Sequence, residues 1–371
     1  MSRLYETQEK AKRAFLVSIV DNPKNDSQVK ELQGLCKTLE LDIIAHEKVR
    51  IREKTPKFGM GSGKAQELSQ KAQELNADLM VFDNFSEKEY PNPSQQRNWE
   101  AICGIPVIDR QELIIRIFAD RATTREAELQ VKLAELSYFL PRLTHKYIDL
   151  SRQRGGRYGT KGAGETKLET DRRKIEKRIN LLEKEIEQIS KHRQMQRRQR
   201  QKSSIPVCAI VGYTNSGKSS LLNTLTGANV LAENKLFATL DAVTRRYEIS
   251  PGNQVLLTDT VGFIKYLPHS LIKAFRSTLE EAALSDLLIH IMDASDPNIE
   301  SNYETTLAVL RELGANEIPM LNVLNKIDML DTEGENTLET LKNRFPGCIA
   351  ISAVNSIGLD ELKNGIISIL K

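Results

Sequence analysis

The segment GYTNSGKSS, residues 212–220, combines glycines, a lysine and hydroxyl groups at a spacing that suits phosphate binding. Gly212 is followed, after four residues, by Gly217, Lys218 and Ser219. Glycines let backbone N–H groups turn inward around phosphates, Lys218 can reach the β and γ oxygens, and the Ser219 hydroxyl can bind Mg²⁺. The apolar run PVCAIV precedes the segment and the helical pattern SSLLNTL follows it. We therefore predict a phosphate-binding loop (P-loop) between a strand and a helix.

A second segment, DTVG at residues 259–262, follows the apolar run VLL and fits the metal and γ-phosphate side of such a site. Asp259 can hold the hydration shell of Mg²⁺, and Gly262 can offer an unobstructed backbone N–H to the γ-phosphate. For the Mg²⁺-sensing threonine, Thr239 in LFATLDAVTRR is the best match and Thr244 a poorer one. We predict Ser219, Thr239 and, through water, Asp259 as metal ligands, and Lys218, Thr239 and Gly262 as catalytic residues.

The segment NKID, residues 325–328, follows the apolar run MLNVL and indicates guanine as the base. The Asp328 carboxylate can accept from N1–H and N2–H₂ of guanine, whereas adenine has no donor at N1. An ordinary helix cap by Asp328 is the alternative. The tripeptide SAV, residues 352–354, matches a loop that offers a backbone N–H to guanine O6. The predicted nucleotide contacts are Gly212, Tyr213, Thr214, Asn215, Ser216, Gly217, Lys218, Ser219, Ser220, Phe237, Ala238, Thr239, Asp259, Thr260, Val261, Gly262, Asn325, Lys326, Asp328, Ser352, Ala353 and Val354.

A similar segment near the N-terminus, FGMGSGKAQEL at residues 58–68, also contains a glycine–lysine pair. Phe58 stands where a P-loop needs its first glycine, and Ala65 replaces the metal-binding hydroxyl. The sequence favours a turn that starts a helix, although the N-terminus of that helix could bind an anion near Gly61–Lys64. The alternative is therefore a site there for ATP or another anion.

Three regions must position these motifs. Residues 1–118 alternate short apolar runs with helical patterns, which predicts a small α/β domain. Residues 119–203 carry two leucine- and isoleucine-rich seams, which predict a helical-hairpin linker in which Pro141 ends the first helix. Residues 204–371 repeat strand, loop and helix, and the turn Pro251–Asn253 predicts one antiparallel hairpin. The expected fold class is α/β, with a mixed, mostly parallel sheet around the P-loop.

Charge is concentrated in the middle of the chain. Residues 142–202 contain 19 Lys or Arg and eight Asp or Glu, although the whole chain has a net charge of only +3. Such a region suits a polyanion such as RNA, because basic groups release counterions from phosphates. Between the seams, the glycine-rich loop 151–167 carries the predicted RNA-binding residues Arg152, Arg154, Arg157, Lys161 and Lys167. A surface linker is the alternative reading of this loop.

The remaining composition excludes several classes of protein. The four cysteines are widely separated and the five histidines do not cluster, so a zinc site is not expected. No apolar run approaches the length of a membrane span. We expect a cytoplasmic protein, peripheral to membranes only through its partners, and a monomer.

Four segments together resemble the HflX family of ribosome-associated GTPases, and the likeness covers nearly the whole chain. They are PSQQRNWE at 93–100, IFADRATTREAELQVKLAELSYFLPRL at 117–143, LSRQRGGRYGTKGAGETKLETDRRKI at 150–175, and LFATLD at 236–241. The resemblance implies an N-terminal domain unlike other GTPases, a helical linker and a G domain. It also implies GTP-dependent binding to the large ribosomal subunit and its RNA, and splitting of stalled ribosomes under stress.

The residue after Gly262 departs from the pattern of many small GTPases, which place a glutamine there or one position later to aim the attacking water. This chain has Phe263 and Ile264 instead. We therefore expect slow basal hydrolysis and stimulation by the ribosome. Asn215 matches a position where related GTPases bind K⁺, although a plain loop hydrogen bond is the alternative. Arg245 and Arg246 are weaker candidates for an internal arginine finger.

The leading hypothesis is thus a GTPase, using GTP, GDP and Mg²⁺, that splits or recycles ribosomes. The alternative is a GTP-dependent ribosome-assembly factor or RNA chaperone that does not separate subunits. An ATP-driven RNA remodeller is disfavoured by Asp328, and a small-molecule or nucleoside kinase would leave NKID unexplained.

Overall fold

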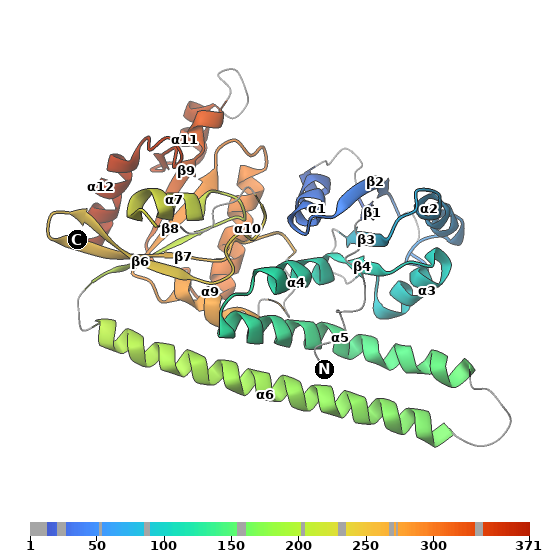
Figure 1. The fold of residues 1–371 in the computed structure, drawn as a ribbon. Coiled ribbons are helices and arrows are strands. Elements are labelled where there is room, and N and C mark those ends of the chain that lie inside the picture. Colours follow the sequence, from blue (N-terminus) through green and yellow to red (C-terminus); the bar gives the residue numbers. More distant parts are fainter. Residues whose placement is uncertain are drawn as a thin grey trace. The chain divides into compact units, whose positions relative to one another are not determined.

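The computed structural model describes residues 13–20, 27–51, 54–84, 90–153, 161–201, 205–228, 235–266, 271, 274–330 and 337–371 (Figure 1). The chain forms two compact units. One comprises Met1–Asp120 with Lys132–Glu183, and the other comprises Arg121–Val131 with Lys184–Lys371. The predicted division into three domains, at 1–118, 119–203 and 204–371, stays a prediction.

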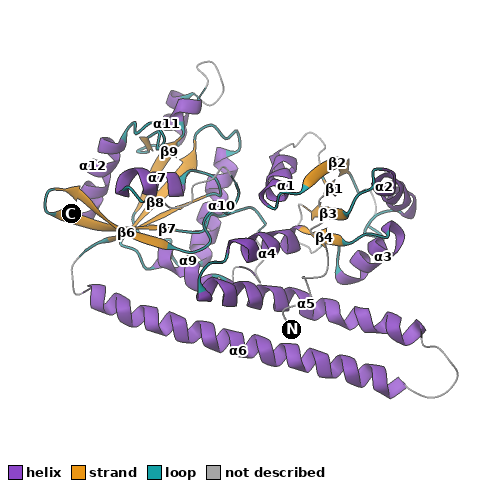
Figure 2. Cartoon of the chain, in the orientation of Figure 1, coloured by secondary structure: helices purple, strands orange, loops and turns teal. Residues whose placement is uncertain are grey.

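The first unit contains a four-stranded parallel sheet in the order β2-β1-β3-β4. Its strands are the apolar runs expected from the sequence, and helices connect them (Figure 2). Phe15, Phe82 and Trp99 are fully buried at the centre of this core. In chain order the elements are β1 (Arg13–Ile19), α1 (Ser27–Thr38), β2 (Asp42–Val49), α2 (Ser62–Glu74), β3 (Leu79–Asn84), α3 (Pro93–Cys103), β4 (Val107–Asp109) and α4 (Arg110–Arg121).

Two long helices follow, α5 (Arg125–Gln153) and α6 (Lys161–Gln201). The prediction that Pro141 ends the first helix is wrong, because α5 continues through it. Contacts on both sides of the proline fix the helix to α4 and β4: Tyr138 donates to Glu112 at 3.1 Å, and Arg142 pairs with Asp109 at 2.8 Å. Arg142 Nη1 also donates to the Tyr138 carbonyl. Tertiary contacts thus outweigh the hydrogen bond that proline removes.

The predicted loop 151–167 is shorter than expected, since residues 151–153 end α5 and residues 161–167 begin α6. Each residue added to an existing helix gains one backbone hydrogen bond, which can outweigh the poor helix propensity of glycine. Arg152 therefore lies on α5, and Lys161 and Lys167 lie on α6. Arg154 and Arg157 lie outside the described residues, so their part in RNA binding stays a prediction.

The second unit contains a six-stranded sheet in the order β10-β9-β8-β5-β7-β6, with only β6 antiparallel to its neighbour. The hairpin predicted at Pro251–Asn253 joins β6 to β7. The elements are β5 (Val207–Gly212), α7 (Lys218–Thr226), β6 (Val243–Ser250), β7 (Asn253–Asp259), α9 (Arg276–Ala283), β8 (Leu287–Asp293), α10 (Ile299–Glu312), β9 (Met320–Asn325), η1 (Ile327–Met329), α11 (Leu338–Arg344), β10 (Ile349–Ala350) and α12 (Leu359–Leu370).

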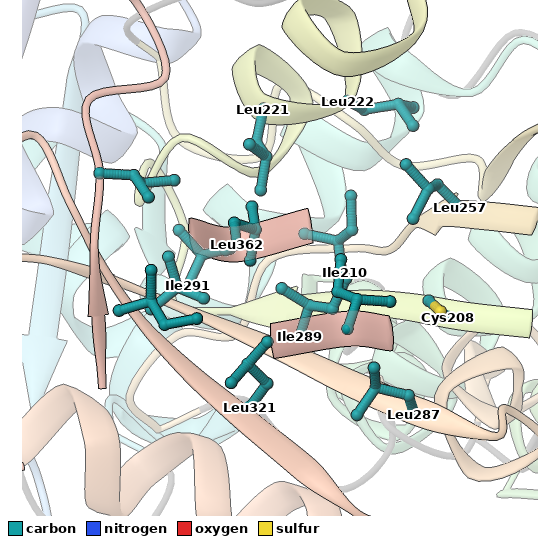
Figure 3. Close-up of a cluster of buried hydrophobic side chains, with 14 of the residues drawn as sticks. Cys208, Ile210, Leu221, Leu222, Leu257, Leu287, Ile289, Ile291, Leu321 and Leu362 are labelled. Carbon is teal, nitrogen blue, oxygen red and sulfur yellow. The ribbon is translucent and has the colours of Figure 1, made fainter. Parts of the chain in front are cut away.

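A hydrophobic core fixes α7 on this sheet. Leu221 and Leu222 project from α7 toward the strand side chains, which include Ile210 and Ile289, and Leu362 of α12 joins the same cluster (Figure 3). All five side chains are fully buried. Because α7 starts directly after the P-loop, its packing also fixes where the loop lies. Among the described residues, no helix has the length and apolar character needed to cross a membrane.

Candidate nucleotide-binding site

The P-loop connects the end of β5 to the start of α7, and neighbouring strands hold both of its glycines. Gly212 has φ 149° and a Cβ there would collide with the backbone carbonyl of Ile291. Gly217 has φ 95° and a Cβ there would collide with the Asn325 side chain. Both positions therefore require glycine for its conformational freedom and for its lack of a side chain.

Lys218 begins α7 and its side chain is buried, with Nζ donating to the Tyr213 carbonyl at 2.8 Å. Burial lowers the pKa of Lys218 to about 8, while nearby Asp259 acts in the opposite direction. A buried ammonium group is costly unless negative charge compensates it. Phosphate oxygens at the loop would supply that charge.

Three oxygen-bearing side chains meet at the N-terminus of α7. Ser219 Oγ donates to Asp259 Oδ2 at 2.6 Å, Thr239 Oγ1 donates to the same oxygen at 3.0 Å, and the two hydroxyls are 2.7 Å apart. Burial raises the pKa of Asp259, and its Oδ1 is buried without a hydrogen-bond partner. Hard oxygen donors around an unsatisfied carboxylate oxygen fit Mg²⁺. The donor atoms present at this position are therefore those that a Mg²⁺ site needs.

The other threonine and the two arginines considered from the sequence lie elsewhere. Thr244 Oγ1 bonds Thr258 Oγ1 at 2.9 Å between β6 and β7. Arg245 and Arg246 are exposed on β6 and do not line the cavity at the P-loop. Of the candidate threonines, the fold brings Thr239 to Ser219 and Asp259.

The segment before Thr239 is fixed by the P-loop itself. The Phe237 N–H donates to Thr214 Oγ1 at 2.9 Å, and Phe237 is buried with a positive φ of 56°. A cavity of about 50 Å³ lies between this segment and the P-loop. Its lining includes the predicted Thr214, Asn215, Gly217, Lys218, Ser219, Ser220, Phe237, Ala238, Thr239, Thr260 and Gly262, together with Lys235.

Asn325 joins the base-binding loops to the P-loop. Its Nδ2 donates to the Ser216 carbonyl at 2.9 Å, and its Oδ1 accepts the Ala353 N–H at 3.0 Å. Asp328 lies within η1 and is exposed, and no side chain caps that short helix. The helix-cap alternative for Asp328 is therefore wrong. Ser352 is buried beside Ala353, while Val354 is exposed.

Sequence analysis missed Asp293, which lies at the end of β8. Its Oδ2 pairs with Lys326 Nζ at 2.6 Å, and Ser295 donates to its Oδ1 from both N–H and Oγ. Lys326 Nζ also donates to the Asn215 carbonyl at 2.8 Å, so one lysine ties β8, the Asn325–Asp328 segment and the P-loop together. The sequence offered one signal, a carboxylate directly after the apolar run LLIHIM, but not that this strand would lie beside the P-loop strand.

The fold and these side chains define a P-loop GTPase, and comparisons with known proteins agree. Family models match residues 26–119 (GTP-binding GTPase N-terminal), 121–200 (GTP-binding GTPase Middle Region) and 207–326 (50S ribosome-binding GTPase). A crystal structure of SsGBP in complex with GDP has 26% sequence identity and a TM-score of 0.52, covering 97% of this chain and 98% of that one.

Curated relatives identify the family. GTPase HflX from Akkermansia muciniphila is 44% identical, over 100% of this chain and 87% of the relative. GTPase HflX from Caldanaerobacter subterraneus is also 44% identical, over 95% of this chain and 79% of the relative, and the Escherichia coli protein of that name is 38% identical, over 97% and 83%. The chain therefore belongs to the GTPase HflX family, as the sequence resemblance predicted, and is a guanine-nucleotide-binding GTPase.

Proposed function

We propose that this GTPase binds the large ribosomal subunit and splits or recycles stalled ribosomes in a GTP-dependent manner, with hydrolysis stimulated by the ribosome. The observation that carries the GTP-dependent part is the Ser219–Thr239–Asp259 cluster beside buried Lys218. The match of residues 207–326 to a family described as 50S ribosome-binding GTPase supports the ribosomal partner, as does the basic stretch 142–202. Cytoplasmic location and a monomeric state belong to the same proposal.

The residues of the site have distinct roles in this proposal. Gly212–Ser220 cradle the phosphates, Lys218 neutralises the β- and γ-oxygens, and the Gly262 N–H contacts the γ-phosphate. Ser219, Thr239 and, through water, Asp259 would hold Mg²⁺, which when bound would supply positive charge against the negative charge that develops on the phosphate. Asp328 would read the guanine edge with Asn325, Lys326 and the Ser352–Val354 loop. We also propose that the Asn215 side chain contributes to a K⁺ site beside the phosphates.

The base-reading role is tested with Asp328→Asn. An amide at this position donates where the carboxylate accepted, so the variant should bind GTP about 100-fold more weakly and accept xanthosine triphosphate. Equilibrium titration with both nucleotides measures the change. An unaltered preference for GTP would remove Asp328 from the base site.

Ribosome splitting is tested by light scattering and sucrose-gradient sedimentation of intact ribosomes with the protein and GTP. We expect conversion to subunits with wild-type protein and none with Lys218→Ala. Replacing Arg152, Arg154, Arg157, Lys161 and Lys167 by alanine together should weaken ribosome binding more than basal hydrolysis, and more steeply as salt is raised. Intact ribosomes combined with binding to subunit precursors would instead favour the assembly-factor function.

A further inference from the structure

The segment that carries Thr239 is bound at its far end to the start of a linker helix. Two residues beyond Thr239, the Asp241 carboxylate accepts three hydrogen bonds from the turn before α5. Its Oδ2 accepts the Thr123 N–H at 3.4 Å and the Thr123 Oγ1 at 2.8 Å, and its Oδ1 accepts the Thr124 Oγ1. Residues 121–131 belong to the same compact unit as the nucleotide site, so these contacts lie within one unit. One carboxylate therefore joins the segment 237–241 to α5.

Thr124 also holds the first turn of α5. Its Oγ1 accepts the Ala127 N–H at 3.2 Å, and its carbonyl accepts the Glu128 N–H at 3.0 Å. This is the pattern of a helix N-cap, in which a hydroxyl oxygen accepts from a backbone donor that has no partner within the helix. Because the same Oγ1 donates to Asp241, one hydroxyl bonds the helix and the segment at once.

The position of Asp241 limits where Thr239 can lie. Two residues of extended chain span at most about 7 Å, so an Asp241 fixed on α5 keeps Thr239 near the metal-binding cluster. Leu240, between them, is buried. Without the contact to α5, the next fixed residue along the chain would be Val243, where β6 begins. The free chain after Thr239 would then include residues 240–242, and each further residue that must be ordered costs conformational entropy.

We propose that Asp241 is a positioning residue: by binding the start of α5, it holds Thr239 where Mg²⁺ and GTP need it. Asp241 does not line the cavity at the P-loop, so its effect passes through Thr239. Because a coupling free energy between two sites is reciprocal, a nucleotide that engages Thr239 also favours the capped start of α5. The inference rests on the Mg²⁺ role proposed for Thr239 and extends it to the linker.

The test is Thr123→Val, which removes one hydrogen-bond donor to Asp241 and changes no residue of the nucleotide site. In a Mg²⁺ titration with a non-hydrolysable GTP analogue, half-maximal binding should require about three- to tenfold more Mg²⁺ than in the wild-type protein. This is the worth of one hydrogen bond. The dissociation constant of GDP, measured without Mg²⁺, should not change, because Thr239 then has no metal to bind.

Three further variants accompany this test. Thr123→Ser keeps the hydroxyl and should restore the wild-type Mg²⁺ requirement. Asp241→Ala removes the whole contact and should raise the requirement at least as much as Thr123→Val. Thr305→Val is the matched control on α10, where the threonine hydroxyl donates to the Ser301 carbonyl of its own helix at 2.7 Å. It should leave both measurements unchanged.

Hydrogen exchange at the Ala127 and Glu128 amides gives an independent readout. In the wild-type protein, both amides should exchange more slowly with Mg²⁺ and the GTP analogue than with GDP. In Asp241→Ala, the two nucleotides should give the same exchange rates. An unchanged Mg²⁺ requirement in Thr123→Val and Asp241→Ala, or wild-type exchange that does not depend on the nucleotide, would overturn the proposal.

Thr239→Val distinguishes a failure of this inference from a failure of the proposed function. The variant should raise the Mg²⁺ requirement because it removes a metal ligand. If it does so while Thr123→Val and Asp241→Ala do not, the metal site stands and the link to α5 is refuted. If Thr239→Val itself leaves the Mg²⁺ requirement unchanged, the metal role in the proposed function fails, and this inference fails with it.

Discussion

Two glycine–lysine segments start helices in this chain, and the fold uses them differently. At α7, Gly212 and Gly217 are pressed against Ile291 and Asn325, and Lys218 is buried. At α2, Gly61 and Gly63 have open space where a Cβ would go. Lys64 pairs with Glu67 at 2.8 Å on its own helix. A glycine–lysine pair becomes a phosphate cradle only where neighbouring strands fold the loop back on itself.

The residues before Gly61 explain why that segment resembles a P-loop at all. Phe58 and Met60 are buried in the core, and the Phe58 carbonyl accepts hydrogen bonds from Tyr90 Oη at 2.6 Å and Trp99 Nε1 at 3.1 Å. The alternation of apolar residues and glycines thus serves to anchor a turn. The anion site considered at Gly61–Lys64 gains no support from this geometry.

The two sheets also differ at the edge where the C-terminal ends of their parallel strands lie. In the G domain, the ends of β5, β7, β8 and β9 carry the P-loop, Asp259, Asp293 and Asn325. In the N-terminal sheet, the end of β3 carries fully buried Asp83, which pairs with Arg110 at 3.0 Å, and Arg110 also contacts Glu31. Parallel sheets commonly bind ligands at this edge. Here one edge is open to a nucleotide and the other is occupied by its own ion pairs.

The largest expected effect is on GTP hydrolysis, and it distinguishes Lys218 of the P-loop from Lys64 of α2. Lys218→Ala should reduce GTP hydrolysis by about 100-fold or more, because a charge aimed at the phosphates is removed. Lys64→Ala, the matched change at α2, should leave hydrolysis unaltered and disturb only an exposed ion pair. Phosphate release by both variants measures the difference. A substantial loss with Lys64→Ala would break the comparison and reopen a second site.

The second largest effect is expected on stability, from the ion pairs at the carboxyl edge of the N-terminal sheet. Arg110→Ala should destabilise the N-terminal unit by about 3–5 kcal/mol, because it leaves Asp83 buried without its cation. Trp99 is the only tryptophan of the chain and lies in this core, so its fluorescence during urea unfolding follows that unit. Arg173→Ala, which breaks an exposed pair with Glu169, is the control and should change stability by less than about 1 kcal/mol. Lost GTP hydrolysis with unchanged stability would make this edge functional instead.

Local patterns predicted most of the nucleotide site and long-range contacts decided the rest. The strands and P-loop follow from short apolar runs and from glycines, which act within a few residues. The continuation of α5 through Pro141 depends on Asp109 and Glu112, which are distant in sequence. Asp293 and the burial of Phe263 depend on which strands become neighbours, so neither could be read from the motif alone.

Each sheet also carries a histidine with a lowered pKa, fully buried His290 and half-buried His46, and acid should affect both. Burial lowers the pKa of His290 on β8 to about 4, and that of His46 on β2 to about 4 as well. His290 bonds Asn322 at 3.2 Å and stacks on Tyr303. Because its folded pKa is below the unfolded value near 6.5, the folded state binds fewer protons, so stability is complete above pH 6.5 and is lost as pH falls toward 4.

This pH dependence predicts a measurable difference in unfolding free energy between the wild-type protein and a variant without the histidine. Between pH 7 and pH 5 the wild-type protein should lose about 2 kcal/mol more unfolding free energy than His290→Asn, which cannot gain a proton. Urea unfolding followed by circular dichroism measures this difference. The relevant transition is that of the second unit, which Trp99 fluorescence does not report. Equal losses in both proteins would show that folding does not lower the pKa of His290.

The smallest effect returns to the two glycine–lysine segments and tests them through backbone freedom alone. Gly63 lies in the first turn of α2 with nothing within 4 Å of a Cβ position. Gly63→Ala should therefore stabilise the N-terminal unit by about 0.5 kcal/mol, because alanine restricts the unfolded chain and favours the helix. The matched change Gly217→Ala should abolish nucleotide binding, since φ is 95° and the Asn325 side chain occupies the space. Trp99 fluorescence in urea and GDP titration measure the pair. If Gly63→Ala destabilises the protein, that turn requires glycine as the P-loop does at Gly217, and the two segments are alike after all.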